Sequence, residues 1–149
     1  MSEPCIQITI YIAATADKVW SALTDPDITE RYWGHTRIES DWQVGSKIVY
    51  RRDGEVMDEH ILLACDPPRR LIHTFHPVFK EEFRDEPPSK VTFELTPGGE
   101  VVRLSMTHDG FPEGSAVYRA CSGAWPMLLS SLKTLLETGQ PLPEFDPGE

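Results

Sequence analysis

The sequence predicts an α+β fold, in which a curved antiparallel sheet of about six to seven strands wraps around one long C-terminal helix. Three observations support this prediction: a helical apolar stripe near the C-terminus, a series of consecutive strand patterns before it, and two short helical patterns after the first strand. Consecutive strands joined by hairpin turns form an antiparallel sheet, and a sheet of this size twists and curls. Its concave face can therefore hold the long helix.

The long helix is predicted over residues 113–138, a length of about 40 Å at 1.5 Å per residue. Pro126 lies inside it, where a proline removes one backbone hydrogen bond and should bend the helix. Residues 128–136 are plain aliphatic and predict tight packing, whereas residues 118–125 mix polar, small and flat side chains and predict the lining of a cavity. The apolar stripe consists of Val117, Cys121, Trp125, Leu128, Leu132 and Leu135.

The N-terminal third predicts one strand and two helices. Isoleucines alternate with polar residues over 6–12, which is typical of a half-buried strand. Thr15 is the expected N-cap of a short helix, and Asp25 caps a second one that has Pro26 at its first position and ends near residues 31–34.

Six more strands are predicted at residues 36–41, 46–52, 55–65, 70–76, 90–96 and 101–108. Asp53-Gly54 forms a two-residue hairpin turn, so Tyr50 should pair with Met57 and Val49 with Asp58.

Composition limits the functions to consider. The 149 residues predict a single domain, with an ordered core over 6–138 and a frayed tail over 139–149. A net charge of −10 argues against nucleic acid and anionic membranes as partners, and no apolar run reaches the length of a membrane span. The N-terminus has no signal-peptide pattern, and the three widely spaced cysteines match no metal or redox motif. We therefore expect a cytoplasmic protein with reduced thiols and no cofactor.

Several motifs carry a family resemblance. VWSALTDPDITERYWG, DPPRRLIHTF, VTFELTPGG, LSMTHDGF and GAWPMLLSSLKTLLE occur in the order seen in the helix-grip superfamily of START and polyketide-cyclase-like (SRPBCC) proteins. Within it, residues 6–137 resemble the branch named for activators of the ninety-kilodalton heat-shock protein ATPase. The resemblance implies a hydrophobic cavity between the sheet and the long helix and, from the branch name, a chaperone partner with a role in the stress response. It does not imply a reaction.

Histidines are common metal ligands, and the chain has five of them. His73 and His76 form an H-x-x-H pattern, but residues three apart on a strand point to opposite faces, so we predict no metal site. His108 ends a strand just before the long helix and could anchor a ligand or transfer a proton. The alternative is a structural histidine that bonds to the backbone and fixes the turn.

The strand over 55–65 has two faces of different character. Asp58 and His60 share one face, and a buried Asp58 would have a raised pKa and could act as an acid or base. The other face, with Met57, Ile61 and Leu63, is more apolar, so the sequence favours a solvated face for Asp58 and His60.

Aromatic residues give the stronger indication of a binding site, because ligand pockets are mostly apolar with few polar anchors. The alternative is that the same rings fill the core and that Cys121 is a small core residue. We favour the pocket for Trp125, and His108 and Tyr118 as polar anchors. The predicted ligand-binding set is His108, Tyr118, Cys121, Trp125, Trp33, Tyr50, Phe75, Phe93 and Met106, with Trp42 as a further aromatic candidate.

The segment over 77–90 is long for a hairpin connection, and such loops are often lids. Its Val78, Phe79 and Phe83 are expected to cover the pocket mouth or to form a homodimer contact. The leading prediction is therefore a protein that binds a small hydrophobic or amphipathic molecule. The alternatives are a chaperone-interaction module, from whose pattern a single domain departs, and a cyclase-type or hydrolase-type enzyme using His108 or Asp58, although no catalytic set is evident.

Overall fold

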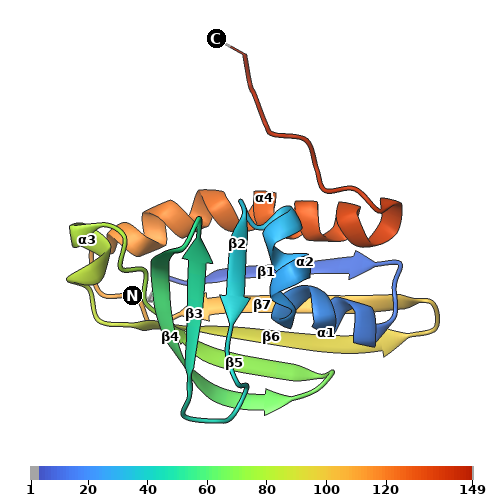
Figure 1. The fold of residues 1–149 in the computed structure, drawn as a ribbon, viewed down its shortest axis with the longest axis horizontal. Coiled ribbons are helices and arrows are strands. Elements are labelled where there is room, and N and C mark those ends of the chain that lie inside the picture. The colour runs from blue at the N-terminus through green and yellow to red at the C-terminus, as the bar shows by residue number, and fades with distance from the viewer. Residues whose placement is uncertain (1–3, 149) are drawn as a thin grey trace.

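The computed structural model describes residues 4–148 and has the predicted α+β architecture (Figure 1). Within these residues, seven strands form one antiparallel sheet in the order β1-β7-β6-β5-β4-β3-β2, and α4 lies across it. The elements are β1 (Ile6–Ile12), α1 (Ala16–Thr24), α2 (Pro26–Tyr32), β2 (Thr36–Glu39), β3 (Lys47–Arg52), β4 (Glu55–Asp66), β5 (Arg70–Phe75), α3 (Glu81–Arg84), β6 (Ser89–Gly98), β7 (Val101–Asp109) and α4 (Ala116–Thr138).

The long helix α4 starts three residues later than predicted and continues through Pro126 without interruption. Its N-terminus is capped twice, because the Ser115 hydroxyl accepts from the Tyr118 N–H at 2.9 Å and the Glu86 carboxylate accepts from the Ala116 N–H at 2.6 Å. Gly139 ends the helix with a φ of 86°, a left-handed conformation that favours glycine. Six of the helix residues are buried: Val117, Trp125, Leu129, Ser131, Leu132 and Leu135.

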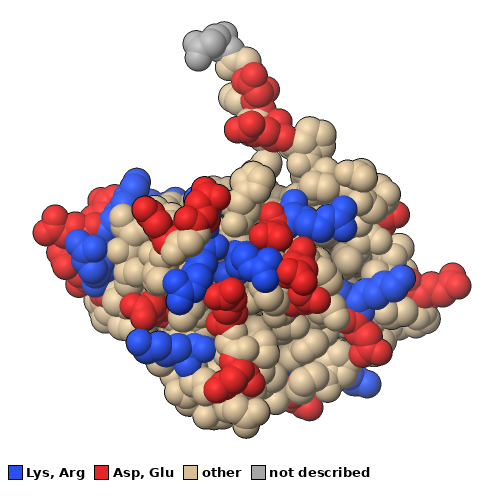
Figure 2. All heavy atoms as spheres, viewed as in Figure 1, with Lys and Arg blue, Asp and Glu red and all other residues tan. Residues whose placement is uncertain are grey.

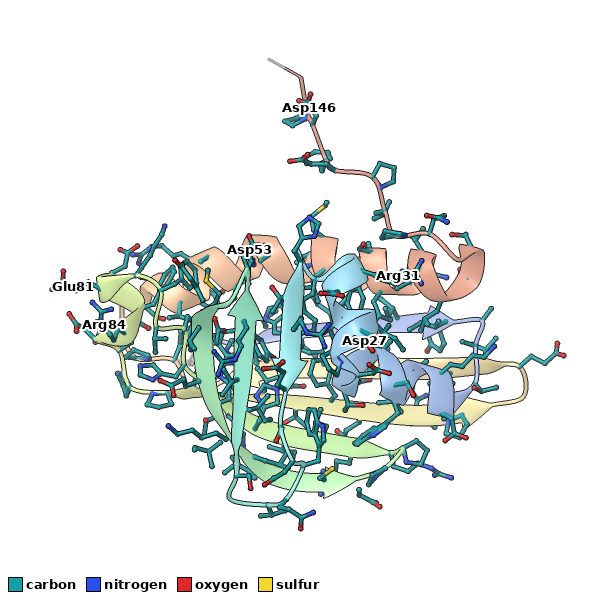
Figure 3. All side chains as sticks on the ribbon, viewed as in Figure 1. Asp27, Arg31, Asp53, Glu81, Arg84 and Asp146 are labelled. Atoms are coloured by element: carbon teal, nitrogen blue, oxygen red, sulfur yellow. The ribbon has the colours of Figure 1, made fainter. Side chains whose placement is uncertain are left out.

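The two short helices follow the predicted capping. The Thr15 side chain accepts from the Lys18 N–H, and the Asp25 side chain accepts from the Asp27 N–H. Figure 3 shows Arg31 of α2 close to the end of α4, where its Nη2 donates to the Gly139 carbonyl at 2.9 Å. The C-terminal half of α4 is therefore held between the sheet and these helices.

The predicted register of the β3–β4 hairpin is wrong. Tyr50 pairs with Asp58 rather than with Met57, and Val49 pairs with Glu59. The register shifts between Tyr50 and Arg51, because Met57 is an extra residue on β4 that has no partner on β3. This bulge places Tyr50 and Asp58 directly opposite each other on one face of the sheet.

The predicted solvent-facing position of Asp58 and His60 is also wrong. Asp58 is 6% exposed and His60 is fully buried, whereas Ile61 and Leu63 on the opposite face are about two-fifths exposed, at 39% and 44%. The hydrophobic pattern of β4 is thus reversed with respect to burial. The strand carries Asp58 and His60 on the concave face below α4, together with Leu62, and exposes Ile61 and Leu63 on the convex face.

The segment after β5 is more structured than the predicted loop. Pro77 forms an isolated bridge with Asp58, α3 spans four residues, and β6 begins at Ser89. Phe83 is buried, and Phe79 packs edge-on against it with the ring centroids 5.3 Å apart. In Figure 3, α3 forms one end of the molecule, with Glu81 and Arg84 on its outer side.

The surface carries both signs of charge. Figure 2 shows acidic and basic side chains interspersed on the face that contains β2 and β3, and acidic residues along the projecting C-terminal tail. Residues 140–148 of that tail have no helix or strand, and position 149 of the predicted frayed segment lies outside the described residues. Over residues 4–148, no helix has the length and apolar character needed to cross a membrane.

Candidate ligand-binding cavity

A cavity of about 170 Å³ lies between the N-terminal half of α4, the β3–β4 hairpin and the segment after β5. Trp33 and Thr36 close it near β2, and Phe79 and Phe83 close it on the side of α3. Most of the wall is apolar, as is typical of small-molecule sites. The lining residues are Trp33, Thr36, Tyr50, Arg52, Met57, Asp58, Phe75, Pro77, Phe79, Phe83, Val117, Ala120, Cys121 and Ala124.

Two polar side chains on the wall belong to almost fully buried residues and make no hydrogen bond to another described residue. They are the hydroxyl of Tyr50, which is 4% exposed, and the carboxyl group of Asp58. Because the hairpin register places these residues opposite each other, both groups face the same cavity. Among the described residues, the buried side-chain atom without a partner is Nε2 of His60, whereas the oxygens of Tyr50 and Asp58 can bond to water or to another molecule in the cavity.

Burial sets the protonation of this pair. Removal from water raises the pKa of Asp58 to about 7, although the positive charge of Arg52 and the neighbouring His73 and His76 act in the opposite direction. Burial also raises the pKa of the Tyr50 hydroxyl well above its usual value, with the Asp58 charge as a second cause. At neutral pH the tyrosine is therefore protonated, and the carboxyl group is close to its midpoint.

His60 lies next to Asp58 and is neutral. Its Nδ1 accepts from the backbone N–H of His76 at 2.9 Å, so the ring proton is on Nε2. That Nε2 is 3.3 Å from Oδ2 of Asp58, outside hydrogen-bond geometry, and is buried without a partner. Because burial lowers the pKa of His60 to about 3, this contact joins a neutral imidazole to the carboxyl group and is not an ion pair.

His108 is buried and both of its ring nitrogens are engaged. Nδ1 accepts from the indole N–H of Trp125 at 3.0 Å, so Nε2 carries the proton and donates to the Ser89 hydroxyl at 2.7 Å. Ser89 in turn donates to the Phe75 carbonyl. Burial lowers the pKa of His108 to about 3, which keeps the ring neutral. This chain ties α4 to the sheet through side chains, not through the bond to the backbone that the structural alternative for His108 supposes.

The predicted site residues therefore fall into two groups. Trp33, Tyr50, Phe75 and Cys121 line the cavity. The remaining five lie elsewhere: Tyr118 packs against Phe111, and Trp125 lies in the core below the cavity, with its ring 5.8 Å from that of Trp33. The five residues outside the wall are Phe93, Met106, His108, Tyr118 and Trp125, and the further aromatic candidate Trp42 is also outside it.

Asp58, Arg52 and Thr36 are wall residues that the predicted set lacks. The hydrophobicity of β4 favours a solvated face for Asp58, although the sequence also offers a buried Asp58 as a candidate acid or base. The Asp53-Gly54 turn was the available sequence signal, since it fixes which residues of β3 oppose β4. The bulge at Met57 shifts that register by one position, and the sequence alone did not reveal it.

The wall offers little nucleophilic or metal-binding chemistry. Burial raises the pKa of the Cys121 thiol to about 12, helped by the charges of Asp58 and Glu86, so it is protonated and weakly nucleophilic. In the part of the chain that the structure describes, no three His, Cys, Asp or Glu side chains are grouped to hold a metal ion. The arrangement is suited to hydrogen bonding.

A curled antiparallel sheet that holds a long C-terminal helix, with two short helices after the first strand and a cavity beneath the long helix, is the helix-grip fold. The chain belongs to the AHSA1 family, whose members are described as Activator of Hsp90 ATPase homolog 1-like proteins, because the family model matches residues 13–137. No curated protein matches the chain significantly.

Several solved structures share this fold. Protein MLL2253 from Mesorhizobium loti is 26% identical, with a TM-score of 0.75 and coverage of 89% of this chain and 96% of that one. The Aha1 dimer from Colwellia psychrerythraea is 24% identical, with a TM-score of 0.73 and coverage of 91% and 97%. PFC0360w, an HSP90 activator from Plasmodium falciparum, is 19% identical, with a TM-score of 0.74 and coverage of 92% and 97%. The last two likenesses concern the fold alone.

Proposed function

We propose that this protein binds a small, largely apolar molecule in the cavity between the β3–β4 hairpin and α4. The observation that carries the proposal is the unpaired couple of Tyr50 and Asp58 on an otherwise apolar wall. The oxygens of this couple are accessible from the cavity, so a molecule that enters it could bond to them while its apolar part contacts the rest of the wall.

The position of the segment after β5 supports the same function. Phe79 is 47% exposed and lies on the cavity wall together with the buried Phe83. Glu86, three residues further on, holds the N-terminus of α4 through the Ser115 hydroxyl and two backbone N–H groups. The segment is thus attached to the helix that forms one side of the cavity, as a cover of the site would be.

A cavity-filling variant tests the proposal. In Cys121→Phe the added ring occupies the cavity, whereas in Ser122→Phe it lies on the exposed side of α4 and serves as the control. The measurements are native mass spectrometry of gently purified protein and thermal-shift screening with small aromatic and aliphatic molecules. We expect binding by the wild type and by Ser122→Phe and loss of binding in Cys121→Phe. Equal binding by both variants, or a wild type that binds nothing in the panel, would contradict the proposal.

A second candidate function follows from the family name, which refers to activation of a heat-shock protein ATPase. We propose chaperone binding as the alternative role, with involvement in the stress response as its consequence. The test is direct binding of the purified protein to the chaperone of its host, followed by an ATPase assay. If Cys121→Phe binds and stimulates the chaperone as the wild type does, the two functions use different parts of the molecule.

We further propose that the chain forms a single domain, that the protein is cytoplasmic and that it forms a homodimer. Free thiols at Cys5, Cys65 and Cys121 support a reducing compartment. Cell fractionation tests the location, and light scattering after size-exclusion chromatography tests the oligomeric state. Limited proteolysis that yields one resistant core would support the single domain.

A further inference from the structure

The size of the cavity limits the ligand. About 170 Å³ is close to the roughly 150 Å³ of an engineered apolar cavity that holds benzene. One six-membered ring with a short substituent therefore fills the space. Trp33, Tyr50 and Phe75 contribute rings to the wall, and flat aromatic ligands pack well against such edges and faces.

The polar groups on the wall are mainly hydrogen-bond donors. They are the Tyr50 hydroxyl, the Cys121 thiol and the guanidinium group of Arg52, which uses only Nη2 to bond the Thr36 hydroxyl at 3.2 Å. Asp58 is the one wall residue whose character depends on its proton. Ionised, it only accepts; protonated, it donates as well. A donor-rich wall favours a ligand atom that accepts.

The surroundings of Asp58 keep a substantial share of its carboxyl groups protonated near neutral pH and favour the protonated form below pH 7. Arg52 and Tyr50 face it from β3, His60 lies beside it on β4, and the other ionisable neighbours are His73 of β5, His76 after β5 and Cys121 of α4. Burial outweighs the opposing charge of Arg52 and raises the pKa of Asp58 to about 7. Oδ2 of Asp58 lies 3.3 Å from Nε2 of His60 without forming a hydrogen bond, so the carboxyl group has no protein partner that fixes its proton.

We propose that the cavity selects a neutral, single-ring molecule with an acceptor oxygen, such as an aryl ketone, which receives hydrogen bonds from Tyr50 and from protonated Asp58. The inference rests on the proposed function, because it specifies the ligand of the same cavity. An amine of equal size fits less well, since the positive charge of Arg52 lies on the wall and a buried cation must be desolvated. The two ligand classes respond to pH in opposite directions.

The test compares acetophenone, ethylbenzene and phenethylamine, which are similar in size, by calorimetric titration of the full chain at pH 6.0 and pH 8.5. Acetophenone should bind up to about thirtyfold more tightly at pH 6.0, because Asp58 must keep its proton to donate and, with a pKa of about 7, its protonated fraction falls by about that factor. Ethylbenzene has no oxygen and should bind more weakly, with the same affinity at both values. Phenethylamine should bind more weakly than acetophenone at pH 6.0.

Two variants test whether Asp58 and Tyr50 cause the expected pH dependence and affinity for acetophenone. Asp58→Asn retains an N–H donor but cannot titrate, so the acetophenone affinity should become equal at the two pH values. Tyr50→Phe should weaken acetophenone binding about tenfold at both pH values without changing ethylbenzene binding. The wild-type pH profile tests the inference even if either variant fails to fold.

Other outcomes would overturn the inference in distinguishable ways. If ethylbenzene and acetophenone bind equally and without pH dependence, the cavity binds ligands but the proposed hydrogen bonds are absent. If phenethylamine binds most tightly and its affinity rises with pH, Asp58 acts as a carboxylate that pairs with a cation. If none of the three molecules binds, the proposed function fails together with the inference.

Discussion

The two halves of α4 face the same sheet but rest on different surfaces. The C-terminal half buries Leu129, Leu132 and Leu135 in the hydrophobic core, which also contains Ile12, Val102 and Leu104 of the sheet, and its Glu137 accepts from the Ala13 N–H after β1. The N-terminal half lies above Asp58 and the buried histidines and leaves a cavity beside them. One helix thus serves stability at one end and a candidate binding site at the other. The difference arises mainly from the strands below it.

The difference between the two halves of α4 is tested most strongly at Leu132, which is fully buried in the C-terminal half. Leu132→Ala should lower the free energy of unfolding by about 2–5 kcal/mol, because it removes buried methyl groups and leaves a void. Chemical denaturation monitored by tryptophan fluorescence measures the change. The control is Leu128→Ala at a half-buried position of the same helix, where a loss of less than about 1.5 kcal/mol is expected. Equal losses would mean that packing is not concentrated on this side of the helix.

Acid should destabilise the protein through the buried histidines below the N-terminal half of α4. The pKa values of His60, His73 and His108 are lowered by burial to about 3, so the unfolded chain takes up protons below about pH 6.5 that the folded protein rejects. Asp58, with its raised pKa, opposes this between about pH 4 and 7. Near pH 5, unfolding lets the three histidines bind a proton each, whereas Asp58 loses one. Acidification therefore lowers the free energy of unfolding, on the order of 1–3 kcal/mol per pH unit.

Denaturation curves from pH 7 to pH 4 measure this dependence. His73→Leu should make it shallower, whereas the control His35→Gln should leave it unchanged, because His35 is exposed. A wild-type protein with constant stability over this range would show that the histidines are not buried as described.

Asp58→Asn should stabilise the protein at alkaline pH, by about 1–3 kcal/mol. A folded pKa raised to about 7 means that the carboxyl group contributes favourably below its unfolded pKa near 4, and that this contribution is lost as the pH rises through 7. The difference between variant and wild type should therefore grow from pH 4 to pH 7 and then level off. Glu59→Gln on the opposite face of β4 is the control. A difference that does not vary with pH would exclude the raised pKa.

Glu86 offers a smaller test at the N-terminal end of α4. Its carboxylate accepts from the Ser115 hydroxyl and from the backbone N–H groups of Ala116 and Val117. Glu86→Ala should cost about 1–2 kcal/mol, because it removes charge-assisted bonds at a helix N-terminus. Thermal unfolding measures the loss, and Glu81→Ala on the outer side of α3 is the matched control. Loss of ligand binding that exceeds the loss of stability would link this cap to the shape of the cavity.

The smallest effect on stability is expected at Cys121. This thiol lies on the cavity wall and is only partly buried, so Cys121→Ala should change the free energy of unfolding by less than about 1 kcal/mol. Val117→Ala, one turn earlier at a buried position, should cost more. A loss at Cys121 equal to that at Leu132 would remove the distinction between the two halves of the helix.

The order and type of the helices and strands could be predicted from the sequence because they depend on local patterns. Alternation over Ile6–Ile12, the caps at Thr15 and Asp25 and the period of the α4 stripe act within a few residues of each position. Each of these elements is present within a few residues of the predicted bounds. The aromatic candidates for the site were only partly placed, because rings of the core and rings of a cavity wall have the same sequence pattern.

The sequence by itself therefore determined the order of the elements, the antiparallel sheet and the helix that lies on it. Only the tertiary structure decided that Asp58 and His60 point inwards, since a strand has two faces and the apolar face of β4 is the outer one. The bulge at Met57 then decided that Asp58 stands opposite Tyr50. Burial of a polar pair depends on segments distant in sequence, α4 and the residues after β5, and no local pattern encodes their position.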